Sequence, residues 1–432
     1  MSTAADPLAD DAPILATPFQ LEAEKLALTI MARADVQAAV AETRAQLRDD
    51  PASARPEGRA ALDRAVALWL GDITLREIAF DHARPQIIHS PAIRPRTWHG
   101  HTFPGSGTAG DSPDNVQRST FMHGGYRYLL SGRLPKSRCA QFTLAFAPDF
   151  HVYYGVGRGR EALPYNSGLG MLRDDQLQIG ADGRFEITID SSPADGRANH
   201  FQLPDAAVDI WVRENLSDWT QQPMRLAIRR LDDHPSPPPL TEDEIAARVI
   251  EGHADLAGHW ARHKETFFGH PPANTLGGPM YRKGGFGYLS FGFFDLADDE
   301  ALLATIDHGG AEYASWQVLD RWYLALDRGP GCISRNNRQV IPNADGSVTY
   351  VMARDDPGAP NWIDTGGVGH GTILVRQQGV ADAIEPKVRD YRVVKLDQIR
   401  GLLPADTPWV TPDQRRAEIE RRAVEIDMRY RR

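Results

Sequence analysis

Residues 209–218 read DIWVRENLSD, and residues 372–381 read TILVRQQGVA. Both stretches alternate polar residues with apolar or β-branched ones, which is the pattern of a half-buried strand. They align at an offset of 163 residues (372 minus 209), and the sequence around them continues the match. This pair therefore indicates an internal repeat of one β-rich unit.

Four further pairs recur in the same order at nearly the same offset. They are DGRFEITID (182–190) with DGSVTYVMA (345–353), Asn199 with Asn361, PMRLAIRRLD (223–232) with PKVRDYRVVKLD (386–397), and GGYRYLLSG (124–132) with GGFGYLSFG (284–292). The Asp-Gly dipeptides favour hairpins. We predict two similar antiparallel lobes, each a sandwich or open barrel. The alternative is that such turns and strands recur without duplication. Residues 296–310 (LADDEALLATIDHGG) are interpreted as a short helix inserted in the second lobe.

Helical patterns flank and separate the lobes, so the fold class is mainly β with helical additions (α+β). The run HPSPPPL at 234–240 has four prolines, which exclude a continuing strand or helix. The charged segment after Pro412 is expected to be a solvated or subunit-bridging tail. The predicted regions are a helical N-terminal region (1–90), the first lobe (91–233), a linker with a helix (234–270), the second lobe (271–398) and a C-terminal helical tail (399–432).

Composition narrows the classes of partner. The 432 residues carry 48 Lys and Arg against 58 Asp and Glu, a formal charge of −10, so a nucleic-acid partner is not expected. No run approaches 18 apolar residues, and no secretory signal opens the sequence. Two cysteines, Cys139 and Cys332, fit a reducing compartment. We expect a cytoplasmic protein with a small-molecule substrate and no membrane partner, and we allow for a homo-oligomer formed through the helical termini.

No standard catalytic signature is present. The sequence contains no Gly-x-Ser-x-Gly, Walker, His-Glu-x-x-His or Cys-x-x-Cys motif. We therefore expect chemistry without a bound cofactor, with a divalent metal as the weaker expectation. The repeat sorts the candidates: residues alike in both halves, such as Arg213 and Arg376, are better explained by the fold. Residues that differ at matched places, such as His200 and Trp362, are better candidates for function.

Acid–base chemistry has four candidates. Asp364 stands two residues after Trp362, and a carboxylate beside an indole is partly desolvated, which raises its pKa. Asp364 or Asp114 is the predicted general base, and His123 or His370 the predicted acid. For each of them the alternative role is a turn, a backbone cap or a buried core position.

Substrate binding and metal binding have separate candidates. Trp219 or Trp362 would supply an apolar wall, Asn337 and Arg338 would polarise an oxygen, and Asn115 would hydrogen-bond the substrate. The alternatives are core positions and exposed loops. His99 and His101 are spaced to point the same way on an extended segment, which suits a metal, and His89 is the nearest third ligand.

Several of these runs together resemble a bacterial family. The resemblance is carried by SPDNVQRS, GGYRYLLSGRLP, DGRFEITI, VRENLSDW and RDDPGAPNWIDTGGVGHGTILVR, of which APNWIDTGG (359–367) is the most specific. It covers about residues 110–395 and is similar to the family known as domain of unknown function 1214. The resemblance implies a β-rich soluble protein, often encoded beside catabolic genes for lipids, steroids or aromatic compounds. A related two-domain branch is associated with divalent metal, but its first domain has no counterpart here. The resemblance assigns no catalytic residue.

The leading hypothesis is a catabolic enzyme that acts on a small, largely apolar hydroxyl or carbonyl compound of steroid, terpenoid or aromatic type. Its reaction would be a cofactor-independent lyase, hydratase or isomerase step. One alternative is a carbohydrate-active hydrolase with paired carboxylates. The other is a non-catalytic protein that binds a small ligand.

Overall fold

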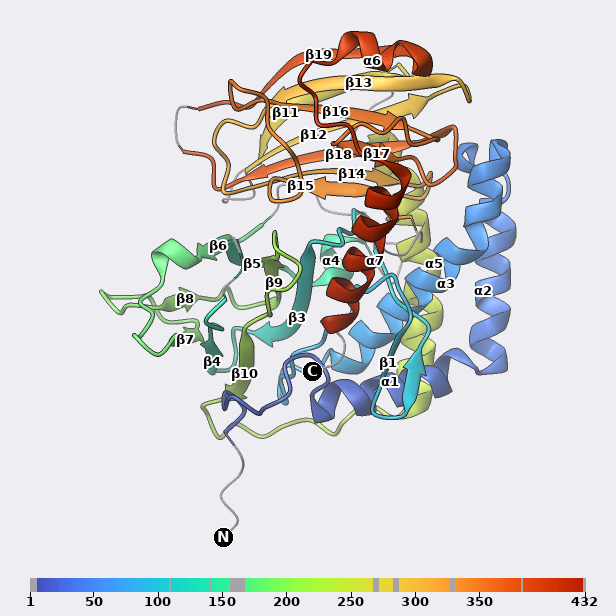
Figure 1. Cartoon of the computed structure of the whole chain (residues 1–432). Coiled ribbons are helices and arrows are strands. Elements are labelled where there is room, and N and C mark those ends of the chain that lie inside the picture. The colour runs from blue at the N-terminus through green and yellow to red at the C-terminus, as the bar shows by residue number, and fades with distance from the viewer. Residues whose placement is uncertain are drawn as a thin grey trace.

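Two β-lobes lie one above the other, and a layer of long helices stands beside them (Figure 1). The computed structural model describes residues 6–108, 110–137, 139, 141–155, 168–266, 272–282, 287–326, 331–381 and 384–429. A short hairpin of β1 (Arg96–Trp98) and β2 (His101–Phe103) precedes the first lobe.

The first lobe packs two four-stranded sheets, ordered β3-β9-β5-β6 and β10-β4-β7-β8. Every strand pair is antiparallel except β7–β8. Alternate residues of β9, such as Val208, Ile210 and Val212, face the core between the sheets. The strands are β3 (Asn115–His123), β4 (Tyr128–Arg133), β5 (Gln141–Pro148), β6 (Gly170–Arg173), β7 (Arg184–Asp190), β8 (His200–Gln202), β9 (Ala207–Asn215) and β10 (Arg225–Arg230).

The second lobe packs a five-stranded sheet, β11-β12-β18-β14-β15, on a four-stranded sheet, β17-β16-β13-β19. Its one parallel pair is β16–β17. Its strands are β11 (Thr275–Arg282), β12 (Gly287–Asp295), β13 (Glu300–Asp307), β14 (Tyr313–Leu319), β15 (Ser334–Asn336), β16 (Val348–Ala353), β17 (Trp362–Asp364), β18 (His370–Gln378) and β19 (Lys387–Lys395).

The two lobes have the same strand order. Strands β3 to β10 correspond one by one to β12 to β19, including the parallel pair, and β11 is added at the edge of the second lobe. The predicted mainly β fold with two similar antiparallel sandwiches is confirmed. The strand pairs matched at 182–190 with 345–353 and at 209–218 with 372–381 are equivalent.

One of the matched pairs is wrong. The segment 124–132 leads into β4, whereas 284–292 leads into β12, which corresponds to β3. The predicted helix at 296–310 is also wrong, because these residues contain β13, the counterpart of β4. Strand β13 lies between β16 and β19 and is buried on both faces, so its Ala- and Leu-rich run lacks the alternation of a half-buried strand.

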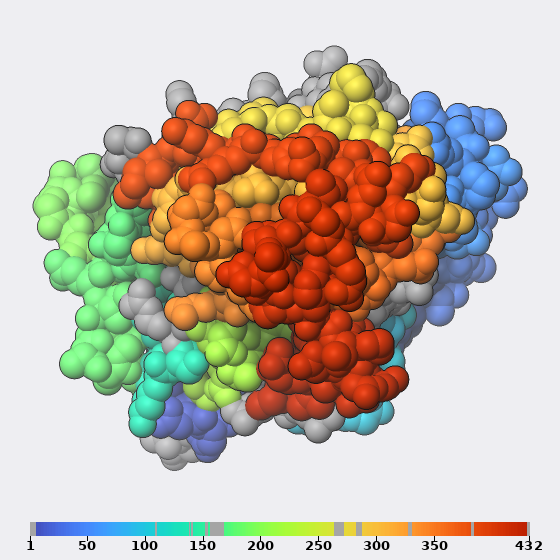
Figure 2. Space-filling model, turned by 45° about the horizontal axis from the view of Figure 1, so that its top comes forward, coloured from blue at the N-terminus to red at the C-terminus, as the bar shows by residue number. Residues whose placement is uncertain are grey.

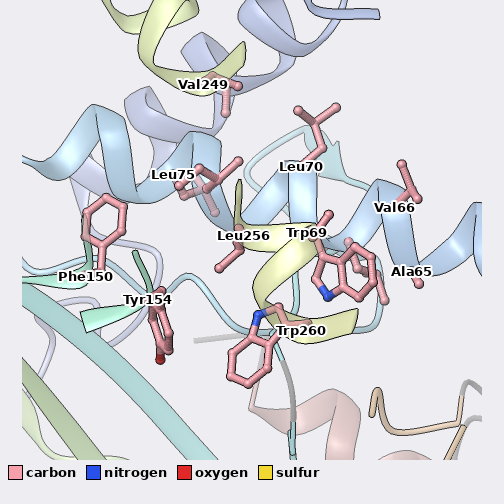
Figure 3. Packing of buried hydrophobic residues seen from close by; sticks show 14 of the residues in the cluster. Ala65, Val66, Trp69, Leu70, Leu75, Phe150, Tyr154, Val249, Leu256 and Trp260 are labelled. Carbon is pink, nitrogen blue, oxygen red and sulfur yellow. The ribbon is translucent and has the colours of Figure 1, made fainter. Parts of the chain in front are cut away.

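Four helices form the layer beside the lobes. A central helix, α3, packs against α1, α2 and α5, and the layer covers the outer face of the sheet that contains β9. A capping box opens α5, since Glu244 N–H donates to Thr241 Oγ1 and Thr241 N–H donates to Glu244 Oε2. Figure 3 shows part of the shared core. The helices are α1 (Pro18–Met31), α2 (Ala34–Leu47), α3 (Pro56–Ala79), α4 (Phe150–Tyr153), α5 (Glu242–Thr266), α6 (Ile399–Leu402) and α7 (Pro412–Met428), with 3-10 turns at Pro51–Ala54, Asp174–Gln176 and Leu396–Gln398.

Helix α7 is not a solvated tail along its whole surface. Arg415, Arg422 and Arg429 recur every seven residues, share one face and are buried. Arg422 Nη2 donates to the Ser334 carbonyl of the second lobe at 3.0 Å, and Arg429 Nη1 donates to the Pro113 carbonyl before β3. The C-terminal segment therefore extends from the second lobe toward the first (Figures 1 and 2). The many charged residues of this segment predicted that it is exposed to solvent. The structure instead buries three of its arginines, whose hydrogen-bond acceptors lie in distant segments of the chain. None of the described helices combines the length and the apolar character that a membrane crossing requires.

Candidate functional site

Asp114 joins the two lobes. Its carboxyl group is fully buried, and its Oδ1 accepts hydrogen bonds from Trp219 Nε1 (2.6 Å) and Asn336 Nδ2 (2.8 Å). Its Oδ2 accepts one from the Tyr313 hydroxyl (2.9 Å). The structure thus brings together two residues predicted as separate candidates, Asp114 and Trp219. Each of the two carboxyl oxygens therefore already accepts a hydrogen bond from a side chain that ties the lobes.

The Trp219 ring contacts the arginines of α7. The guanidinium carbons of Arg422 and Arg429 lie 4.2 Å and 5.5 Å from its ring centroid. These cation–π contacts are favourable when desolvated. Trp219 therefore serves as the connection between α7 and Asp114 in this conformation.

A chain of amides crosses the seam near Asp114. Asn115 Nδ2 donates to Asn215 Oδ1 at 2.9 Å, and Asn215 Nδ2 donates to Gln378 Oε1. Asn215 and Gln378 occupy equivalent positions at the ends of β9 and β18. The predicted substrate ligand Asn115 thus participates in the contact between lobes.

The remaining acid–base candidates lie in other parts of the molecule. Asp364 Oδ1 accepts a hydrogen bond from Gly366 N–H at 2.7 Å, as in a turn, and Trp362 packs in a small core beside α7. His370 begins β18, paired with Asp295. Burial lowers the pKa of His370 to about 4, so its ring is neutral at pH 7. His123 Nδ1 accepts a hydrogen bond from Gly125 N–H at 3.0 Å.

The candidates for oxygen polarisation and metal binding either form hydrogen bonds within the protein or are exposed to solvent. Asn337 Nδ2 donates to the Glu312 carbonyl at 3.0 Å, and Arg338 is exposed. His99 lies in the hairpin turn with a φ of 46°. His101 Nε2 donates to buried Glu24 (2.8 Å), and His89 Nδ1 donates to the Gln117 carbonyl (2.8 Å). Among the described residues, no group of three His, Cys, Asp or Glu side chains is arranged to hold a metal ion.

A second buried charge network joins α3 to the first lobe. Asp72 and Arg76 lie one turn apart on α3, and Arg76 Nε donates to Asp72 Oδ2 at 3.0 Å. Across the interface, Arg76 Nη1 donates to Asp209 Oδ2 at 3.2 Å. Asp209 projects from the outer face of β9, where Trp211 Nε1 also donates to its Oδ2. The side chains of Asp72, Arg76 and Asp209 are at most 2% exposed.

This network is not saturated. Within the part of the chain that the structure describes, Asp209 Oδ1 and Arg76 Nη2 are buried without a hydrogen-bond partner. One guanidinium also faces two carboxylates. Burial raises the pKa of Asp209 to about 7, and the charges of Asp149 and Asp72 add to this, although Arg76 and Trp211 oppose it. A carboxyl group of this kind exchanges its proton near neutral pH.

His151 borders the same network. Its Nε2 donates to Glu77 Oε1 at 2.7 Å, and its Nδ1 donates to Asp149 Oδ1 at 3.2 Å. Burial alone would lower the pKa of His151, but the hydrogen bonds to Asp149 and Glu77 raise it to about 9. The ring is therefore an imidazolium at pH 7, and each of its nitrogens donates to a carboxylate. Its positive charge compensates the negative charges of Glu77 and Asp149.

A group of aromatic rings extends from Trp211, which donates to Asp209, to α5. The Trp211 and Tyr154 rings are nearly parallel, at 11°, with centroids 6.3 Å apart. Trp260 and His259 of α5 lie 5.3 Å and 5.0 Å from Tyr154. Asp209 and Trp211 also place a carboxyl beside an indole, the arrangement predicted for Asp364 and Trp362 and present at Asp114 and Trp219.

The repeat contained the signal for this site. At the positions of Asp209 and Trp211 the second lobe has Thr372 and Leu374, whereas Arg213 is matched by Arg376. Residues that differ between the lobes were predicted to be the functional ones, and the same comparison along β9 would have selected Asp209. Arg76 carried no such signal, because it lies in the helical N-terminal region, outside the repeated segments.

One solved structure is similar to this chain over most of its length. No protein-family model matches the chain, and no curated protein does. The chain is similar to the crystal structure of an uncharacterized protein from Burkholderia cenocepacia, with 25% identity over 87% of this chain and 99% of that chain and a TM-score of 0.65. A protein of Vibrio parahaemolyticus matches at 11% identity over 65% of this chain and 90% of that chain, with a TM-score of 0.37.

Proposed function

We propose that this protein is an enzyme that moves a proton on a small, largely apolar compound carrying a hydroxyl or carbonyl group, in a lyase, hydratase or isomerase step. The observation that supports the proposal is the Asp209 carboxyl group. It is buried, it keeps one oxygen without a partner among the described residues, and burial brings its pKa to about 7. Perturbed buried carboxyls of this kind cluster at catalytic sites.

Each residue of the network has a role in this proposal. Asp209 Oδ1 takes or returns the proton, because a general base is most effective when its pKa is near the working pH. Arg76 retains an N–H group that stabilises negative charge developing on the substrate oxygen. Asp72 positions Arg76 by accepting a hydrogen bond from Arg76 Nε. We choose Asp209 over Asp114 because the oxygens of Asp114 already accept three hydrogen bonds.

The substrate class rests on the aromatic side chains beside Asp209 and on the resemblance to the family of domain of unknown function 1214. A flat, apolar wall next to a protonatable carboxyl suits a steroid, terpenoid or aromatic compound. A cytoplasmic location is part of the same proposal.

Deuterium exchange tests this function without knowledge of the product. The protein is incubated in D2O with a panel of steroid, cyclic terpenoid and aryl ketones, and deuterium uptake is followed by mass spectrometry. We expect at least one ketone to exchange faster with protein than in buffer. The Asp209→Asn variant should lose about 100-fold or more of that rate, the usual contribution of a general base.

Asp320→Asn is the matched control. Burial raises the pKa of Asp320 to about 6. The Asp320 oxygens accept hydrogen bonds from Trp322 N–H (2.8 Å), Leu324 N–H (3.0 Å) and Arg64 Nη1 (3.3 Å). The Asp320→Asn variant should therefore leave the deuterium-exchange rate per folded molecule unchanged. Unchanged exchange in Asp209→Asn would remove Asp209 from the reaction. Ligands that raise the melting temperature without any exchange would instead favour the non-catalytic binding protein.

A further inference from the structure

A groove of about 670 Å³ lies beside the first half of α7, the helix drawn in red in Figure 2. Clefts of about 300–1,000 Å³ are the usual size of small-ligand sites. Residues of α7, α6, the segment that joins them and the loop after β16 line this groove. Part of the lining is apolar and consists of Pro357, Val410, Pro412 and Ile419. A ligand with an apolar body therefore has both space and a matching surface here.

Interactions within the protein fix the walls of the groove. Val410 N–H, in the segment before α7, donates to the Gly358 carbonyl of the loop at 2.8 Å. Arg415 Nε donates to Asp356 Oδ2 of the same loop at 2.8 Å. The Arg415 guanidinium carbon also lies 5.3 Å from the Trp362 ring centroid. The walls are therefore held in place before a ligand binds.

One charged residue of the lining is positioned without a partner of opposite charge. The other two arginines of the lining, Arg415 and Arg416, are each paired with a carboxylate. Arg400 of α6 forms no ion pair with any residue that the structure describes. Its guanidinium carbon lies 4.2 Å from the Trp409 ring centroid. This cation–π contact positions the guanidinium group and leaves its N–H donors available.

A guanidinium without an anion, beside an apolar wall, selects a particular ligand. The planar N–H fork of arginine binds a carboxylate through two parallel hydrogen bonds. Glu420 also lines the groove, and it has no arginine partner in the described ranges. Its negative charge disfavours a ligand with two negative charges, such as a phosphate monoester. The lining thus matches one carboxylate group attached to an apolar body.

We propose that this groove is a second ligand site, which does not include Asp209 and which binds a small apolar monocarboxylate with the carboxylate group on Arg400. Helix α7 forms one wall of the groove and also contacts both lobes through Arg422 and Arg429. A carboxylate bound there connects α6 to α7 and stabilises the position of α7 across the seam. The inference does not depend on the proposed function.

Calorimetric titration of the full chain with 2-naphthoate and 2-naphthalenemethanol tests the site, because the two probes share the apolar ring system and differ in charge. We expect 2-naphthoate to bind about 3- to 10-fold more tightly at pH 7, the range of a charge-assisted pair at an exposed arginine. Arg400→Met keeps an apolar stem without the guanidinium group and should reduce this preference below about 2-fold. Because Arg400 is exposed, we expect the variant to fold.

Arg421→Met is the matched control, since Arg421 is an exposed arginine of α7 that does not line the groove. It should leave the preference unchanged. Glu420→Gln should tighten the binding of 2-naphthoate by up to about 2-fold, because it removes a negative charge from the lining.

Three results would overturn the site: equal binding of the two probes, no binding of 2-naphthoate, or an unchanged preference in Arg400→Met. Asp209→Asn separates this inference from the proposed function. Because Asp209 lies outside the groove, this variant should bind 2-naphthoate as the wild type does while it loses deuterium exchange.

Discussion

Asp114 and Asp209 are both completely buried, yet their hydrogen bonds are distributed differently. Both oxygens of Asp114 accept hydrogen bonds, from an indole, an amide and a hydroxyl. At Asp209 one oxygen accepts both bonds, and the other has no partner among the described residues. A buried carboxyl group whose two oxygens both accept hydrogen bonds fixes the contact between the segments that donate them. A buried carboxyl oxygen without a donor can still take up a proton or accept a hydrogen bond from a ligand.

The largest effect on stability is expected from removing Asp114, which accepts hydrogen bonds on both of its carboxyl oxygens. Asp114→Ala would leave the buried donors of Trp219, Asn336 and Tyr313 without their acceptor. Each such donor costs about 1–3 kcal/mol, and we expect a total loss of about 3–5 kcal/mol because the site relaxes. Urea unfolding followed by tryptophan fluorescence measures it. Asp205→Ala, at an exposed position, is the control and should change stability by about 0.5 kcal/mol or less. A loss below about 1 kcal/mol at Asp114 would contradict the role of this residue in the seam.

A smaller effect is expected at Glu418 on α7. It accepts hydrogen bonds from Arg335 Nη1 (2.7 Å), Arg335 Nη2 (3.2 Å) and Arg415 Nη1 (2.5 Å). Burial would raise the pKa of Glu418, but these arginines lower it from 4.5 to about 2. The stability that it contributes is therefore complete above pH 4.5 and is lost as the pH falls toward 2.

Replacement of Glu418 by Gln should cost about 2–3 kcal/mol at pH 7 and much less near pH 2. Unfolding free energies measured at several pH values test this, with Glu420→Gln on the exposed face of α7 as the matched control. An equal cost at both ends of the pH range would show that the ion pairs do not hold α7.

At pH 5, the smallest of the three effects on stability is expected at Asp209. Its folded pKa of about 7 lies above the ordinary value of 3.8. Between these values the folded chain keeps a proton that the unfolded chain releases, so wild-type stability falls as the pH rises from about 4 to about 7. Asp209→Asn should be within about 1 kcal/mol of wild type at pH 5 and should lack this slope. A difference between the two proteins that stays constant with pH would show that Asp209 does not titrate there.

The repeat predicted the lobes because equivalent strands keep similar side chains, as in DGRFEITID and DGSVTYVMA. The prediction was wrong where a short motif, Gly-Gly-aromatic, occurs before non-equivalent strands. It was also wrong at β13, whose two buried faces remove the alternation. Asp114 and Trp219 were selected separately, as a general base and an apolar wall, but the hydrogen bond between them was not predicted. The charge network was not, because a buried arginine such as Arg76 or Arg422 is recognised only when the distant acceptors that satisfy it are known.

The contact between Asn215 and Gln378 relates the two lobes to each other. The two residues are equivalent in the two lobes, and they touch each other. In a symmetric dimer, only a residue near the two-fold axis meets its own copy. A carboxamide suits that place, because it carries a donor and an acceptor and can therefore pair with itself. At this point of the seam, equivalent residues of the two lobes therefore meet as the two copies of one residue meet on the axis of a symmetric dimer.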